Sequence, residues 1–130
     1  MYTTTTHSIM VTVEATYLDE ESRPRRNRYL WAYHVTIENR GVETVQLMGR
    51  HWKITDSLGR TQEVRGEGVI GEQPIIEPGE CYEYSSGTPL STPSGIMVGS
   101  YFMETREGRP LEIDIPAFSL DSPGERPQVH

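Results

Sequence analysis

The sequence predicts an all-β fold in which about seven or eight short antiparallel strands pack as two sheets. Apolar and polar residues alternate in several segments, and no long window has the i, i+3, i+4, i+7 spacing of an amphipathic helix. Nine prolines and twelve glycines divide the 130 residues into short pieces. This pattern is typical of a β-sandwich of the immunoglobulin or fibronectin III type.

The first strands follow from strict alternation. Residues 9–17 and 29–37 place apolar side chains at every second position, as a half-buried strand does. A third strand starts near Thr44 and changes its apolar phase between Leu47 and Trp52. One extra residue restores the facing, so we expect a bulge within residues 48–51. A turn at 57–60 and a short returning strand at 61–65 follow.

The second half of the chain continues the pattern. Short strands are expected at 81–85, 96–105 and 111–117, and residues 88–95 read as a polar loop rich in proline and serine. Residues 96–105 are apolar on both faces, which indicates a central, doubly covered strand or one that faces a dimer partner. In the last strand, the inward phase is expected to hold Leu111, Ile113, Ile115 and Ala117. We expect one domain at residues 8–120, a flexible N-terminus at 1–7 and a flexible tail at 121–130.

Composition narrows the functional classes. The net charge of −7 argues against a nucleic-acid-binding protein that relies on phosphate contacts. The first residues have no apolar signal-peptide core, and no apolar run is long enough to cross a membrane. Cys81 is the only cysteine, so no intrachain disulfide can form. These features predict a cytoplasmic location without membrane insertion.

A glycine-rich stretch, RGEGVIGEQP at residues 65–74, has the spacing of a dinucleotide-binding fingerprint. That motif requires a helix immediately after it, whose N-terminus holds the pyrophosphate. Pro74 and Pro78 exclude a regular helix here. Two interpretations remain. Either the glycines allow special backbone geometry, or backbone N–H groups form an anion-binding loop that includes Arg65, Gly66, Gly68 and Gly71.

No residue pattern in the chain indicates a catalytic or metal site. The sequence has no HExxH, CxxC or GxSxG motif, and its four histidines are far apart. We therefore expect no enzyme activity, no catalytic residues, no bound cofactor and no metal ligands. The candidate interaction surface combines two residues at the expected bulge with three residues of the serine-rich segment: His51, Trp52, Ser85, Ser86 and Gly87.

Four stretches together resemble the ApaG family (DUF525), over residues 7–120: HSIMVTVEATYL, GRHWKITDSLGR, VRGEGVIGEQPIIEPGE and YSSGTPLSTPSGIMVGSYFM. The resemblance implies a fibronectin III-like sandwich. It also implies a genetic link of bacterial members to cobalt resistance and magnesium efflux, and a gene near one for a diadenosine tetraphosphate hydrolase. Related domains in F-box proteins and in a DNA-polymerase-interacting protein imply contacts between proteins.

These observations predict a protein-interaction module that works through strand edges and end loops and is linked indirectly to Co²⁺ or Mg²⁺ efflux. Its partner is unidentified, and a homodimer is one option. The alternative is a phosphate- or nucleotide-binding domain that uses the glycine-rich loop. Direct binding of a divalent cation is a weaker alternative.

Overall fold

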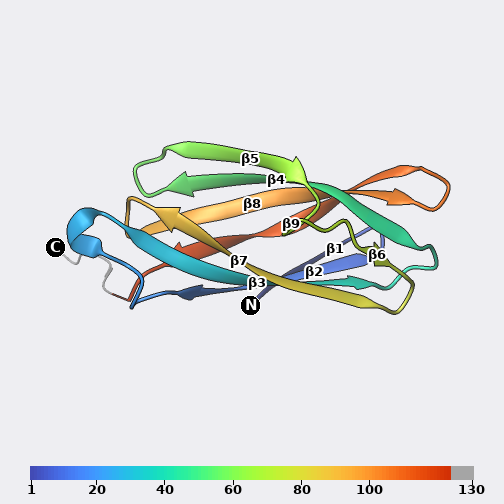
Figure 1. Ribbon diagram of the computed structural model, residues 1–130, viewed down its shortest axis with the longest axis horizontal. Coiled ribbons are helices and arrows are strands. Elements are labelled where there is room, and N and C mark those ends of the chain that lie inside the picture. Colours follow the sequence, from blue (N-terminus) through green and yellow to red (C-terminus); the bar gives the residue numbers. More distant parts are fainter. Residues whose placement is uncertain (124–130) are drawn as a thin grey trace.

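The structure is a computed structural model that describes residues 1–123. Its strands form two antiparallel sheets that face each other across one core (Figure 1). The first sheet has the order β1-β2-β3-β7, and the second has the order β5-β4-β8-β9, with the short strand β6 paired to β4. The strands are β1 Tyr2–Thr6, β2 Ile9–Tyr17, β3 Tyr29–Asn39, β4 Val45–Asp56, β5 Thr61–Glu67, β6 Ile75–Ile76, β7 Cys81–Leu90, β8 Ser94–Thr105 and β9 Pro110–Asp121.

This architecture confirms the predicted all-β sandwich. A 3-10 helix at Pro24–Arg26 interrupts the connection between β2 and β3. Within residues 1–123, no helix has the length and hydrophobicity that a membrane crossing requires.

The core consists of the apolar side chains that occupy every second, inward-facing position of the strands. In β2 and β3 every odd-numbered position from Ile9 to Val13 and from Trp31 to Ile37 is buried. In the second sheet, Trp52 packs edge-to-face against rings from three other strands, with centroid distances of 5.4 Å to Tyr33, 6.4 Å to Tyr101 and 6.0 Å to Phe118. Edge-to-face contact is a favoured geometry for aromatic rings. Aromatic packing therefore joins the two sheets at their centre.

Two bulges set the facing of the second sheet. The register between β4 and β8 shifts between Leu47 and Gly49, which confirms the predicted bulge. A second shift lies between β8 and β9, where Pro116 and Ala117 lie opposite the single residue Val98. This bulge was not predicted, and it reverses the phase of β9. As a result Phe118 is buried and Ala117 is exposed, so the expected inward position of Ala117 is wrong.

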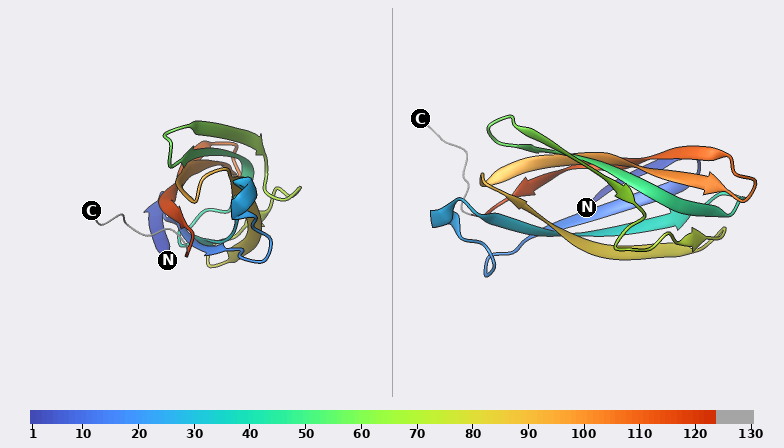
Figure 2. Two further views of the ribbon diagram at one scale, coloured as in Figure 1. Left: turned by 90° about the vertical axis from the view of Figure 1, so that its left-hand side faces the viewer. Right: turned by 45° about the horizontal axis from the view of Figure 1, so that its top comes forward.

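The two long sides of the sandwich differ (Figure 2, left). On one side, which we call the closed seam, β1 lies against β9. The Tyr2 hydroxyl bonds to the Ser119 hydroxyl at 2.9 Å, and the Asp114 N–H donates to Thr6 Oγ1 at 3.2 Å. On the other side, the open seam, β5 and β7 are sheet edges, and in the described part of the chain no hydrogen bond joins them.

Two boundaries differ from expectation. Residues 1–7 were expected to be a flexible segment outside the domain, but Tyr2–Thr6 form β1, which pairs with β2. Residues 88–95 were expected to be a loop, but β7 continues to Leu90 and β8 begins at Ser94. Pro89 fits in β7 because this is an edge strand, and the register points the position of its missing N–H away from β3. Of the expected tail, Asp121 ends β9, and residues 124–130 lie outside the described residues.

Candidate functional site

The glycine-rich stretch ends β5 and forms a tight hairpin. Val69 and Glu72 exchange both backbone hydrogen bonds, at 2.8 and 2.9 Å, around the two central residues Ile70 and Gly71. Both central residues have positive φ, 48° and 75°, which is the pattern of a type I′ turn. A β-branched residue is unusual in this region of φ, and the Ile70 side chain is 61% exposed at the tip of the turn. No helix follows, as the two prolines predicted.

Three glycines here meet three different steric demands. A Cβ atom on Gly66 would lie 2.8 Å from Nη1 of Arg50, whose guanidinium lies over this position. A Cβ atom on Gly68 would lie 2.0 Å from the backbone oxygen of Glu72, and Gly68 has a φ of +58°. Gly71 has open space around it but a φ of +75°. The local sequence therefore allows the hairpin and leaves room for an arginine beneath β5.

The residues of the candidate anion-binding loop take separate positions. Arg65 lies opposite His51 in the β4–β5 ladder, on the outer face of the second sheet. Gly66 lies opposite Arg50, one position further along, and so faces the interior. The Gly68 N–H donates to the Met48 carbonyl at 2.9 Å and is already occupied. Anion binding by this loop stays a prediction that its backbone geometry does not favour.

The candidate interaction residues divide among three places. His51 lies on the outer face of the second sheet, where Nε2 bonds to Glu63 Oε1 at 2.8 Å and holds the pKa of Glu63 below its ordinary value. Ser85 lies on the outer face of the first sheet, and its hydroxyl bonds to His34 Nδ1 at 2.8 Å. Trp52 is only 2% exposed, so it is not a surface residue. With Ser86 and Gly87, Trp52 lines a cleft at the open seam.

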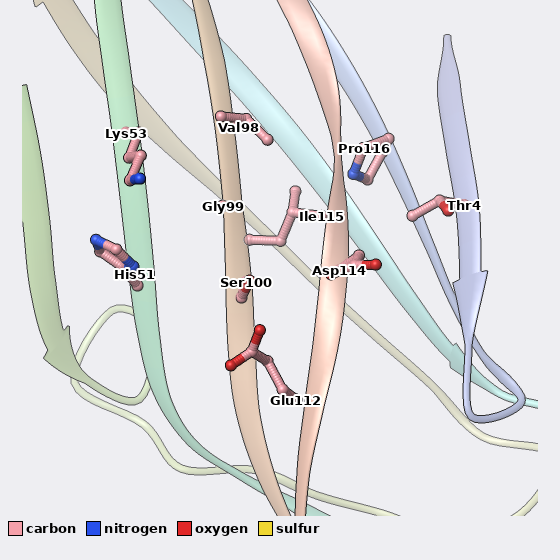
Figure 3. A pocket seen from close by; sticks show the side chains of 10 residues that line it. All are labelled: Thr4, His51, Lys53, Val98, Gly99, Ser100, Glu112, Asp114, Ile115 and Pro116. Carbon is pink, nitrogen blue, oxygen red and sulfur yellow. The ribbon is translucent and has the colours of Figure 1, made fainter. Parts of the chain in front are cut away.

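The outer face of the second sheet carries a shallow groove of about 510 Å³ (Figure 3). Its floor is the middle of β8, with Val98, Gly99 and Ser100, and β4 and β9 form its sides. The outward phase of β8 exposes three apolar side chains on either side of Ser100: Ile96 is 54% exposed, Val98 40% and Phe102 37%. Residues 96–105 are thus central in the sheet, as predicted. The predicted cover on their second face is absent from the described residues.

The cleft at the open seam was not anticipated from the sequence. It lies between β5 and β7, has a volume of about 260 Å³, and is lined by Arg50, Trp52 and Tyr33 among others. Arg50 is the functional candidate that sequence reasoning missed. A signal was present, because Arg50 shares the inward phase of Trp52 and Ile54 after the predicted bulge. An arginine at an inward position of a sheet is unusual and requires partners.

Potential metal ligands do not gather in the described structure. Among residues 1–123, no group of three or more His, Cys, Asp or Glu side chains could hold a metal ion together. Cys81 is a free, exposed thiol, and partial desolvation by its neighbours together with the nearby Glu38 carboxylate raises its pKa.

The fold defines a small β-sandwich domain with an open groove and a lateral cleft. A family model described as the ApaG domain matches residues 19–105, and the chain belongs to this family. It is 60% identical over its full length to Protein ApaG of Parvibaculum lavamentivorans, which it also covers completely. It is 62% identical to Protein ApaG of Rhodospirillum centenum over 97% of each chain. Among solved structures, a protein from Bordetella pertussis described as ApaA superposes with a TM-score of 0.86 at 45% identity, covering 90% of this chain and 95% of that one.

Proposed function

We propose that this ApaG domain is a non-enzymatic protein-interaction module that binds its partner through the groove on the outer face of the second sheet. The observation that carries the proposal is the exposed apolar stripe of Ile96, Val98 and Phe102 on a central strand. Exposed apolar side chains grouped on one face are typical of an interaction site, because a partner that covers them removes apolar surface from water. His51, a residue of the candidate interaction surface, forms part of one side of this groove.

The charges beside the stripe define the chemistry of the partner. Lys53 lies on the β4 side of the groove, and Glu112 and Asp114 lie on the β9 side (Figure 3). In the described chain neither carboxylate forms an ion pair with a basic side chain. A complementary partner surface has an apolar ridge that meets β8 and Lys or Arg side chains that meet β9. Complementary charge of this kind fixes orientation and raises the association rate.

The cellular setting of the proposal follows from the family resemblance. We place the domain in the cytoplasm, where it contacts a transporter or a regulator of a transporter. Its connection to cobalt resistance and magnesium efflux is then indirect, through that partner and not through a bound ion.

The test uses the purified protein as bait in a lysate, followed by binding measurements with each purified protein that is recovered. Val98→Glu places a charge in the apolar stripe without entering the core, and we expect it to weaken binding by about tenfold or more, since an unpaired charge in an apolar contact is costly. Asp114→Lys tests the charge side of the groove and is expected to weaken binding most at low salt. The matched control is Thr12→Glu, on the outer face of the first sheet.

Two results would contradict the proposal. In one, Val98→Glu and Thr12→Glu bind every recovered protein equally well. In the other, sedimentation of the pure protein shows a dimer that Val98→Glu dissociates, and no other protein is recovered. The groove would then hold a second copy of this chain.

The two alternatives are tested directly. Titration with pyrophosphate and nucleotides, followed by amide NMR shifts at Gly66, Gly68 and Gly71, tests the anion-binding loop. Calorimetry with Co²⁺ and Mg²⁺ tests direct cation binding. Binding at those glycines, or a saturable heat with either ion, would make the corresponding alternative the better description.

A further inference from the structure

The cleft at the open seam combines an apolar wall with unused polar groups. The β4–β5 register orders the wall: Arg50 lies beside Gly66, Trp52 beside Val64, and Ile54 beside Gln62. The opposite wall is the β7 segment of Ser86, Gly87, Thr88 and Pro89, and Met97 and Tyr33 also contact the space. The cleft is thus polar at the Arg50 end and apolar along Trp52, Val64 and Ile54.

Trp52 contributes an unpaired donor. Its indole Nε1 is fully buried and is the one buried side-chain N or O atom in the described residues that has no hydrogen-bond partner. Atom Cε3, on the opposite edge of the indole, lies 3.1 Å from the position that a Cβ of Gly99 in β8 would take. Trp52 also lines the cleft, so its indole N–H signal can report a ligand that packs against the ring.

Arg50 contributes a positive charge that no carboxylate neutralises. Its Nη1 donates to the carbonyls of Glu67 and Gly68 at 3.1 and 2.9 Å, which fixes the guanidinium beneath β5. In the described chain no Asp or Glu oxygen lies within 4 Å of it. The remaining N–H groups stay available, since a guanidinium has five in a fixed planar arrangement. The absence of a side chain at Gly66 is what allows this position.

We propose that this cleft binds a small organic monocarboxylate, with its carboxylate at Arg50 and its apolar body along Trp52, Val64 and Ile54. A carboxylate has two acceptor oxygens that match the two parallel N–H groups of a guanidinium edge. The Ser86 hydroxyl interacts with the Tyr33 oxygen beside the cleft, and this leaves the Tyr33 O–H able to donate to the same head group. A phosphate dianion fits less well because the cleft offers a single cation, Arg50, to balance its two charges.

The size of the cleft limits the ligand. A volume of about 260 Å³ is below the usual range for drug-sized ligands, so the body is a single ring or a short aliphatic chain. This site is separate from the groove on the outer face, because the cleft opens between β5 and β7. Ligand binding in the cleft and partner binding in the groove can therefore be tested independently of each other.

The test is an NMR titration that uses the two tryptophan indole N–H signals. The probe is benzoate, with benzamide as the neutral analogue and inorganic phosphate as the second anion. We expect benzoate to shift the Trp52 signal with a Kd on the order of 1 mM. The Trp31 signal serves as an internal control, since its Nε1–H already donates to the Asp121 carbonyl at 2.9 Å, and it should not move.

Substitutions then separate the site from general charge effects. Arg50→Gln should weaken benzoate binding by about tenfold, and Arg65→Gln, which removes the same charge from the outer face, should leave it unchanged. Arg50→Lys keeps the charge if Arg50→Gln fails to fold, and it should bind benzoate more weakly than the natural protein because it loses the planar donor set. The proposal is wrong if benzamide or phosphate shifts the Trp52 signal as benzoate does, if the Trp52 signal does not move, or if Arg65→Gln and Arg50→Gln have equal effects.

Discussion

Replacing Gly68 by alanine should destabilise the hairpin after β5 far more than replacing Gly71, although both residues have positive φ. In Gly71→Ala the new Cβ meets open space, so the free energy of unfolding falls only by the cost of holding alanine in the left-handed backbone conformation, about 1 kcal/mol. Gly68→Ala has the same backbone cost. It also places its Cβ 2.0 Å from the backbone oxygen of Glu72, and a backbone oxygen cannot rotate away as a side chain can. The hairpin must then open.

The magnitude follows from what opening the hairpin removes. Two backbone hydrogen bonds between Val69 and Glu72 are lost, each worth about 1 kcal/mol. The buried Val69 side chain, 1% exposed, also loses packing. With the backbone cost, Gly68→Ala should reduce the free energy of unfolding by about 3 kcal/mol, bounded by what this local unit contributes.

Urea unfolding monitored by circular dichroism measures both variants against the natural protein, with equal m-values as the condition for comparison. Thermal unfolding should agree, with the midpoint for Gly68→Ala lower by about 10 °C and that for Gly71→Ala by about 3–5 °C. If the two variants differ by less than about 1 kcal/mol, the steric reading of Gly68 is refuted.

Three further predictions concern buried polar groups and ion pairs. Burial raises the pKa values of Tyr84 and Tyr101, whose hydroxyls bond to each other, above the ordinary value of 10.0. Their contribution to stability is therefore complete below that pH and is lost above it, so their tyrosinate absorbance should appear only together with alkaline unfolding. The hydrogen bond from His51 lowers the pKa of Glu63 below 4.5, so its contribution is present above that pH and is lost in acid. Glu63→Gln should flatten the loss of stability as the pH falls below about 4.5, measured by urea unfolding at each pH. Asn39 is fully buried and its side chain makes three hydrogen bonds to backbone groups, so Asn39→Ala should cost about 2–4 kcal/mol in the same assay, and a loss below about 1 kcal/mol would contradict this assignment.

The alternation of apolar and polar residues correctly predicted those strands that bury one face in the core. Residues 9–17 match β2 at both ends, and the phase change before Trp52 located the bulge in β4. Both signals are local, because one buried face imposes a period of two on the strand. β1 was missed because its threonine run shows no alternation and its position depends on pairing with β2.

The remaining errors depend on tertiary position. Gly87 and Pro89 would both be unfavourable in a central strand, so the sequence around them is typical of a loop. β7 is an edge strand, and an edge strand tolerates both residues. Likewise, sequence reasoning identified the glycines but not the reason for Gly66, because the group it accommodates is Arg50 of the neighbouring strand. The contact of Arg50 with Gly66, like the bulge opposite Val98, becomes visible only when the register between strands is known.

The difference between the two long sides of the sandwich has a consequence for architecture. The chain enters through β1 and finishes its last strand in β9, and these strands lie together on one flank. A domain joined directly before β1 or directly after β9 would therefore attach at that flank and leave the opposite one, with Arg50 and Trp52, unobstructed. A sandwich arranged in this way can be joined into longer polypeptides while its lateral opening remains accessible.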